Sequence, residues 1–295
     1  MLETLIGDNG FIGVSHLSQK LARERSEKLG VSAIAKVIEA ANSAGASGYT
    51  FSTHPINLQV LTALRSSKTL RNEFALYPVL PYAQGYVRLA NEKGMRALVD
   101  ETLNKLPLTH RAKAVVETGI SAVRLDPVRL LRAYVNVELK SYLSVKPEHS
   151  SIRSVLLHEV VTDLCLGLNN LNLLNAFAQF IREEYEVSPG FVTYNLVRFV
   201  ELFRQEGMTL DGVTIMTPFN SIGYQMSPSR EASEACLASL SKSNVIAMSL
   251  LAGGYLTLDQ ALEYLQRLPQ HVGVAVGAST RQHAEDTFNR LRGLK

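Results

Sequence analysis

The stretch VGVAVGASTRQHAEDTFNRL, residues 272–291, contains the pattern that decides the fold. Its first part alternates branched valines with the tiny residues Gly273, Ala275 and Gly277. Successive residues of a strand point to opposite faces. One face is therefore tiny, as the crowded inside of a barrel requires, and the other is suited to packing on helices. The second part has helical spacing, so the stretch predicts a barrel strand followed by a helix.

The same unit recurs along the chain. Short apolar strands that alternate with amphipathic helices predict a parallel sheet covered on both faces. Eight such units match the TIM barrel, and although an open doubly wound sheet has the same local pattern, eight regular units favour closure. We therefore predict an α/β fold, a (β/α)8 TIM barrel that forms a single domain over residues 1–295. The predicted strands are 4–8, 48–52, 73–80, 151–159, 189–195, 211–219, 244–250 and 273–279.

Residues 81–150 interrupt this rhythm between the third and fourth strands. The segment reads as helical and is longer than a βα connection and its helix usually need. It follows the carboxyl end of strand three, which is the active-site side of a barrel. We predict a helical insertion that either covers the pocket or joins subunits into a homo-oligomer.

Composition narrows the class of protein. The 295 residues are 46% hydrophobic and carry a net charge of +3, with 30 basic residues that are scattered rather than clustered, which argues against a nucleic-acid partner. The two cysteines exclude a disulfide framework. The amino-terminal MLETLIGDNG lacks the pattern of a signal peptide, and no apolar run is long enough for a membrane span. We expect a cytoplasmic enzyme that acts on a small molecule, without a membrane partner.

Candidate catalytic residues follow from the barrel, because reacting groups come from the carboxyl ends of its strands. His158 stands at the end of the fourth predicted strand in SVLLHEVVTD, residues 154–163, and its ordinary pKa near neutrality suits proton transfer. A histidine that only satisfies its own hydrogen bonds is the alternative. The ends of the first three strands add Asp8, His54 and Tyr77.

The same residues also suggest a metal site, but the sequence favours this interpretation less than a catalytic one. HEVVTD lacks the second histidine of the zincin motif, since position 162 is threonine. Ligands from separate strands could still combine, for example His16 and His54 with His158. We predict no metal ligand and rank a metal ion below a nucleotide cofactor.

The stretch GASTRQHAE, residues 277–285, predicts an anion site. A turn of small residues leads into a helix, whose free N–H groups attract phosphate. In TIM barrels the loops after strands seven and eight often hold phosphate. Plain capping of the helix would give the same sequence. The predicted cofactor-binding residues in these two loops are Gly253, Gly254, Ser279, Thr280 and Arg281.

The motifs of the second half of the chain, taken together, resemble those of the aldo/keto reductase superfamily. SVLLHEV at 154–160 looks like that family's fourth strand, which ends in the active-site histidine, and FVTYN at 191–195 is similar to the segment that presents an asparagine to the nicotinamide. NVIAMSLLAGGYLT at 244–257 and VAVGASTRQHAEDTFNRL at 274–291 look like its seventh and eighth strands with their cofactor loops. The resemblance implies an oxidoreductase that uses NADP or NAD.

Carried over residue by residue, the resemblance implies three roles. His158 would orient the substrate carbonyl, Asn195 would bind the nicotinamide carboxamide, and Ser279 would contact the phosphate.

The rest of the family's catalytic tetrad is absent. Ser52 stands where the family has aspartate, Asn57 stands where it has the proton-donating tyrosine, and the third strand, FALYPVL, has no lysine. A catalytic tyrosine depends on that lysine to lower its pKa. The residues that could substitute from other positions are His54, Tyr77, Tyr82 and Lys140.

Three functions stay open on the sequence. The first is a divergent NAD(P)-dependent oxidoreductase acting on a small carbonyl or alcohol. The second is a non-redox barrel enzyme, a lyase, isomerase or metal-assisted hydrolase, acting on a small phosphorylated or carboxylated substrate. The third is a non-catalytic binding barrel. The cofactor loops favour the first.

Overall fold

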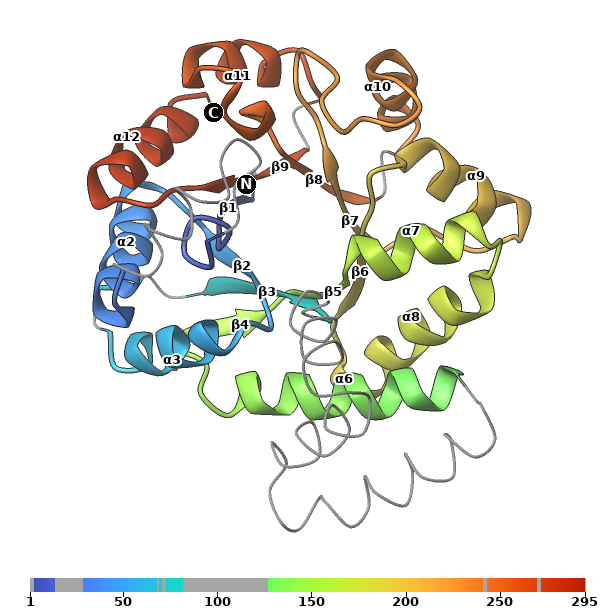
Figure 1. Ribbon diagram of the computed structural model, residues 1–295, viewed down its shortest axis with the longest axis horizontal. Helices are drawn as coiled ribbons and strands as arrows, with labels where there is room; N and C mark the ends of the chain where they lie inside the picture. The colour runs from blue at the N-terminus through green and yellow to red at the C-terminus, as the bar shows by residue number, and fades with distance from the viewer. Residues whose placement is uncertain are drawn as a thin grey trace.

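The computed structural model describes residues 3–13, 29–67, 69–70, 73–81, 127–240, 243–269 and 272–294. Its strands form one sheet in which every pairing is parallel, and β2 pairs with both β1 and β3, which closes the ring (Figure 1). The predicted closed α/β barrel is therefore confirmed. The strands are β1 Thr4–Gly7, β2 Gly48–Ser52, β3 Phe74–Leu80, β4 Ser150–Ile152, β5 Ser154–Leu157, β6 Ser188–Val192, β7 Thr214–Pro218, β8 Asn244–Met248 and β9 Gly273–Gly277.

Helices surround the ring of strands (Figure 1). Each helix turns a buried apolar face toward the sheet, and Ile34, Ile38 and Ala41 on one face of the first described helix illustrate the spacing. The helices are α2 Val31–Ala44, α3 Pro55–Leu64, α6 Pro127–Leu143, α7 Glu159–Gly167, α8 Leu171–Tyr185, α9 Leu196–Gln205, α10 Arg230–Ala238, α11 Leu258–Leu265 and α12 Arg281–Arg292, with the 3-10 turn η1 Ala252–Gly254.

Two separate cores divide the side chains of each strand by parity. In β9, Val274 and Val276 belong to the outer core between sheet and helices, whereas Ala275 faces the inner core of the barrel. The expected alternation of branched and tiny residues is thus present. The inner core contains Leu5, Ala75, Tyr77, Leu156, Val192, Met216 and Ile246.

Two strand glycines are required by close packing. A Cβ on Gly48 would lie 2.3 Å from the carbonyl oxygen of Ala75, and one on Gly190 would lie 2.7 Å from Oγ of Ser154. Real side chains do not make such contacts, so glycine lets the neighbouring strands approach at these points.

The fourth barrel strand is broken and shorter than predicted. It runs as β4 and β5 around Arg153, both paired with β3, and it ends at Leu157 rather than at 159. His158 is extended and its side chain accepts a hydrogen bond from the backbone N–H of Val160, which starts α7. Because His158 caps α7, residues 160–162 (VVT) are helical. Their β-branched side chains have a strand propensity that did not predict this helix.

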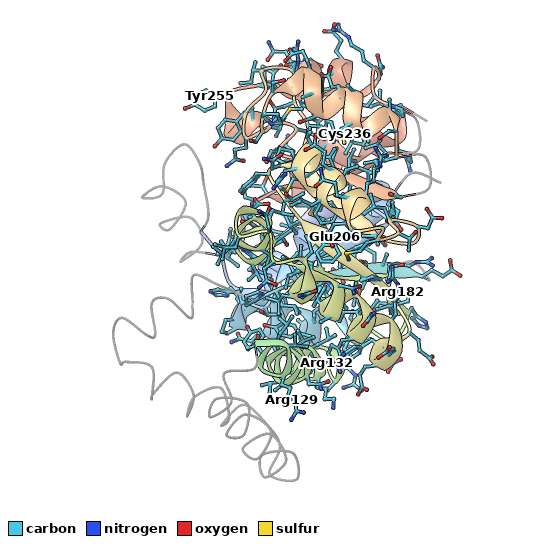
Figure 2. The ribbon with its side chains drawn as sticks, turned by 90° about the vertical axis from the view of Figure 1, so that its right-hand side faces the viewer. Arg129, Arg132, Arg182, Glu206, Cys236 and Tyr255 are labelled. Atoms are coloured by element: carbon cyan, nitrogen blue, oxygen red, sulfur yellow. The ribbon has the colours of Figure 1, made fainter. Side chains whose placement is uncertain are left out.

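The third unit ends in α6, which lies on the outer layer between α3 and α8 and also touches β3 (Figure 1). Lys140 on this helix is exposed, and Figure 2 labels Arg129 and Arg132 on the same helix. Residues 82–126 of the predicted insertion, with Tyr82, lie outside the described residues, as do Ser15 and His16. The insertion at 81–150 therefore stays a prediction.

The barrel has two distinct faces. Tyr255, which follows β8, and Arg182, which precedes β6, lie on opposite sides of the molecule in Figure 2. The first of these faces carries the ends of the strands where barrel chemistry is expected. No described helix is long and apolar enough to cross a membrane.

Candidate active site

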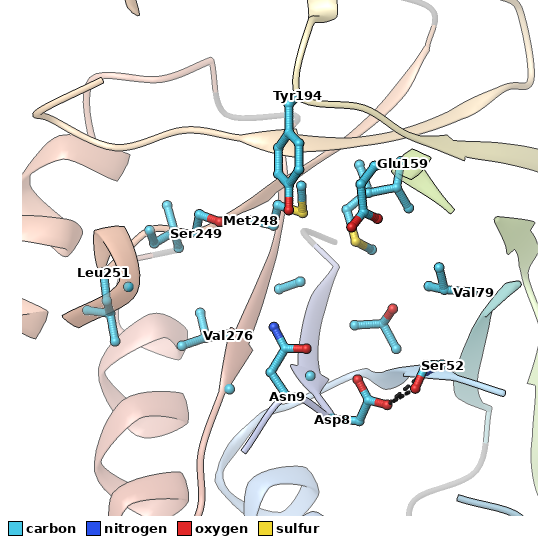
Figure 3. Close-up of a pocket in the computed structure, with 18 of the residues that line it drawn as sticks. Asp8, Asn9, Ser52, Val79, Glu159, Tyr194, Met248, Ser249, Leu251 and Val276 are labelled. Atoms are coloured by element: carbon cyan, nitrogen blue, oxygen red, sulfur yellow. Dashed lines mark hydrogen bonds between the residues drawn. The ribbon is translucent and has the colours of Figure 1, made fainter. Parts of the chain in front are cut away.

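A pocket of about 400 Å³ opens at the carboxyl ends of the strands. Seen from within, Tyr194 and Glu159 project into it from one side and Asp8 and Asn9 from the opposite side (Figure 3). The lining also includes Met216 and Met248, which pack in the inner core of the barrel. Barrel topology therefore gathers residues from β1, β2, β3, β6, β7, β8 and β9, and from the segment after β5, into one cavity.

His158 lines this pocket directly after β5, where the sequence predicted it. Its Nδ1 accepts the N–H of Val160 at 3.2 Å, so Nδ1 carries no proton in this arrangement. The proton of the neutral ring then sits on Nε2, which becomes a hydrogen-bond donor.

Burial keeps the ring of His158 neutral. It lowers the pKa of His158 from 6.5 to about 4, against the opposite influence of the Asp8 and Asp163 carboxylates. Glu159 Oε2 lies 3.1 Å from Nδ1 and would form an ion pair only with the protonated ring. At neutral pH the ring of His158 is therefore a neutral hydrogen-bond donor through Nε2 and not a cation.

Asp8 stands beside Ser52 at the end of β1. Its Oδ2 accepts hydrogen bonds from the backbone N–H and the hydroxyl of Ser52, at 2.8 and 2.7 Å, and from Nδ2 of Asn57 at 2.7 Å (Figure 3). The resemblance expects an aspartate at the end of β2, where this chain has Ser52. A different carboxyl group, that of Asp8 after β1, lies next to Ser52. Burial raises the pKa of Asp8, and the hydrogen bonds oppose this shift only in part.

The family's tyrosine and lysine positions hold no reacting group in this chain. Asn57 is fully buried, and its Oδ1 accepts the hydroxyl of Tyr49 at 2.7 Å. It fastens the turn after β2 and does not reach the pocket. Val79 is the residue of β3 that lines the cavity. Among the residues that the structure describes, these two positions therefore do not supply the tyrosine–lysine pair that aldo-keto reduction ordinarily uses.

Tyr194 lines the pocket, although it was not among the predicted site residues. Strand parity could have found it, because Val192 and Tyr194 share the inward face of β6, and both line the pocket. Asp163 in α7 holds the segment, accepting the hydroxyl of Thr193 at 2.5 Å and the N–H of Tyr194 at 3.1 Å. Burial and the nearby charge of Glu159 raise the pKa of the Tyr194 hydroxyl.

The structure does not bring Asn195, His54 or Tyr77 into the pocket. Asn195 and His54 cap helices instead, accepting N–H groups of Arg198 and Ile56.

Tyr77 lies in the inner core, and its hydroxyl donates to Glu3, which precedes β1 at the opposite end of the barrel. Lys140, exposed on the outer layer, is also absent from the cavity. Neither side chain therefore stands in for the missing tyrosine or lysine at this site.

The predicted cofactor loops border the other half of the pocket. Gly253 and Gly254 line it, and both have positive φ, which shapes the turn after β8. Gly7 and Gly277 pair across β1 and β9 and also line it. A Cβ on either would meet no atom closer than 3.9 Å, so these two glycines leave space in the pocket rather than relieve a clash.

The phosphate residues predicted after β9 have partners within the chain. Thr280 caps α12 by accepting the N–H of His283, and exposed Arg281 forms an ion pair with Glu285 at 2.8 Å. Neither these two residues nor Ser279 is among the lining of the cavity. The helix start at Arg281 nevertheless follows directly on the strand that ends in pocket-lining Gly277.

The pocket's charge is set by carboxylates. Asp8 and Glu159 line it, and no lysine or arginine does among the lining residues that the structure describes. Within the described part of the chain, no group of three histidine, cysteine or carboxylate side chains is arranged to hold a metal ion.

Comparison with solved structures identifies the type of barrel. The chain is similar to a Pseudomonas aeruginosa protein assigned to the aldo-keto reductases, with a TM-score of 0.57 and 13% identity, covering 99% of this chain and 91% of that one. The chain has the barrel fold of the aldo-keto reductases. The holo form of an aldo-keto reductase from Bacillus halodurans is similar to it with a TM-score of 0.55 and 11% identity, covering 98% and 86% of the two chains.

Sequence comparison adds no closer relation. No protein-family model matches the chain, and no curated protein matches it. The fold is thus shared with these structures at low sequence identity, and the two described positions discussed above hold Asn57 and no lysine.

Proposed function

We propose that this chain is an oxidoreductase of the aldo-keto reductase type, which uses NAD(P) to interconvert a small carbonyl compound and its alcohol. The observation that carries the proposal is the pocket itself. It joins a neutral histidine donor, His158, to an open backbone floor at Gly7 and Gly277. The fold shared with aldo-keto reductases supports the same reading.

The described residues fit the nicotinamide end of such a cofactor. The floor at Gly7 and Gly277 has room for a flat ring, and the turn at Gly253 and Gly254 can approach it with backbone groups. The N–H groups at the start of α12 can receive a phosphate. When bound, the reduced nucleotide supplies a hydride to the carbonyl carbon.

The chain's own residues have separate roles in this reaction. The Nε2–H of His158 orients the substrate by donating to its carbonyl oxygen. Tyr194 and the methionines Met216 and Met248 limit the space around the substrate and exclude water. A small substrate fits because the cavity measures only about 400 Å³ and must hold the nicotinamide as well.

The test is nucleotide oxidation by the purified full chain over a panel of small aldehydes and ketones. In His158→Asn the amide oxygen can still accept the N–H of Val160, so helix α7 stays capped while the ring donor is lost. We expect the variant to retain the fold and to lose about 10²- to 10³-fold in turnover. Absence of nucleotide consumption by the wild type on every compound would contradict the proposal.

A second candidate is a non-redox enzyme that moves a proton next to a carbonyl. The observation in its favour is the pair of carboxylates, Asp8 and Glu159, in a pocket whose described lining has no cation. Incorporation of solvent deuterium into a carbonyl compound without any nucleotide would support it. Nucleotide-dependent reduction without such exchange would support the oxidoreductase.

A further inference from the structure

Among the residues that the structure describes, the family's proton-donor position carries no acid for the proposed reaction. Reduction of a carbonyl needs a proton at the oxygen, and the family's tyrosine position holds buried Asn57. His158 is neutral, with a pKa of about 4, so it has no exchangeable extra proton to give at neutral pH. The raised pKa of Tyr194 makes its hydroxyl a weaker acid than usual.

The two carboxyl oxygens of Asp8 have different hydrogen-bond surroundings. Three donors converge on Oδ2, two from Ser52 and one from Asn57. A proton on Oδ2 would point at these donors, so a proton that Asp8 takes up belongs on Oδ1. Figure 3 shows the second oxygen of Asp8 turned toward the cavity.

The side chains that hydrogen-bond Asp8 are uncharged and are themselves held by hydrogen bonds. Asn57 donates to the carbonyl of Ser52 at 2.8 Å as well as to Asp8, and it accepts from Tyr49. Asp8 itself is 7% exposed.

Uncharged amide and hydroxyl donors hold the carboxyl group in place without a cation, so burial raises its pKa. Asp8 interacts electrostatically with three titratable groups, His158, Tyr49 and Tyr142. Both tyrosines are neutral at ordinary pH, and His158 is neutral above its lowered pKa.

We propose that Asp8 gives the proton to the substrate oxygen, in place of the absent tyrosine. The O–H bond at Oδ1 breaks and the proton passes to the carbonyl oxygen, which becomes the hydroxyl of the product. The hydride at carbon comes from the reduced nicotinamide nucleotide, and the Asp8 carboxylate then takes its next proton from solvent. The inference rests on the proposed oxidoreductase and assigns its acid to a different strand from that of the family.

The first measurement is the pH titration of the aspartate carboxyl carbons by NMR. Burial raises the pKa of both Asp8 and Asp163, so we expect two aspartates to titrate above the ordinary range and one of these two signals to be absent from Asp8→Asn. In Ser52→Ala, Asp8 loses a hydroxyl donor that favours the carboxylate, so its titration moves to higher pH. Titration of Asp8 in or below the ordinary range would overturn the proposal.

The second measurement is the pH profile of turnover. In Asp8→Asn the amide oxygen can take the place of Oδ2 against the three donors, so the fold is kept while the proton is lost. We expect turnover to fall about 10²- to 10⁴-fold with little change in KM. In Ser52→Ala the alkaline limb of the profile should move upward with the NMR titration, which a merely structural role would not produce.

Two outcomes of the second measurement would remove Asp8 from the reaction. One is an Asp8→Asn enzyme with an unchanged rate and profile, and the other is loss of the alkaline limb in Glu159→Gln but not in Asp8→Asn. Absence of any nucleotide-dependent turnover in the wild type would instead remove the oxidoreductase. The NMR titration would then still decide whether Asp8 holds the proton.

Discussion

His158 combines two functions that the sequence could not separate. The alternatives were a catalytic group and a histidine that satisfies its own hydrogen bonds, and in the structure Nδ1 serves the second while the residue also lines the pocket. This division depends on the start of α7, which a reading of 151–159 as strand concealed. The residue was identifiable, but the state of its ring was not.

The buried neutral ring of His158 predicts a loss of stability in acid. Its folded pKa of about 4 lies below the ordinary 6.5, so between these values the unfolded chain binds the proton more readily than the folded chain. Stability is therefore complete above 6.5 and falls as the pH drops toward 4, by about 3 kcal/mol from this group.

The measurement is urea unfolding at several pH values on wild type and His158→Asn. Asp8, whose raised pKa acts in the opposite sense, is present in both proteins, so the difference between the two curves reports the His158 ring together with its interaction with Asp8. We expect the wild type to lose stability relative to the variant as the pH falls through this window. Parallel curves would show that the ring is not kept neutral.

Other site residues were hidden because their contacts are long-range. Asp8 meets Ser52 and Asn57 across more than forty positions of sequence, and only the pairing of β1 with β2 brings them together. Tyr194 differs, since the alternation of β6 already pointed it inward. Asn195, chosen through the family resemblance, caps α9 instead.

At the scale of elements, the glycines of the strands divide into two kinds. Gly190 allows β5, β6 and β7 to approach, whereas Gly7 borders open space. Gly190→Ala would force Ser154, Leu156 and Thr214 apart, and we expect it to cost about 1–3 kcal/mol. Gly7→Ala, the matched substitution, should change stability by less than about 0.5 kcal/mol.

Chemical denaturation of the two variants checks this pair. Equal destabilisation by both would show that Gly7 is also packed against its neighbours and that the pocket floor is not open. The alternation in β9 made the tiny face predictable from sequence, but both Gly190 and Gly7 read simply as strand glycines. Their difference arises from neighbouring strands.

At the scale of the whole molecule, the periodicity of the sequence was sufficient to predict a closed barrel. Eight apolar strands followed by amphipathic helices leave few other arrangements, and the observed ring agrees. The end of the fourth strand was less predictable, because the side chain of His158 caps a helix there. Assembly of subunits through residues 81–150 stays a prediction, and sedimentation of the full chain and of a variant altered there would test it.

Closure of the sheet predicts one cooperative unfolding transition. Because β1 pairs with both β2 and β9, and β2 with β3, the described sheet has no seam at which one part could separate from the rest. Calorimetry of the full chain should give a single peak whose calorimetric and van't Hoff enthalpies agree. Two resolved peaks would contradict the single domain proposed over residues 1–295.

The central claim is that the pocket over Gly7 and Gly277 receives a nicotinamide nucleotide. Isothermal titration calorimetry with NADPH and NADH tests it most directly on three proteins: the wild type, Gly277→Val, whose side chain would fill the open floor, and Gly30→Ala, whose Cβ meets nothing within 4 Å. We predict one binding event for at least one nucleotide, kept in Gly30→Ala and lost in Gly277→Val. No binding by the wild type, or equal binding by Gly277→Val, would contradict the account.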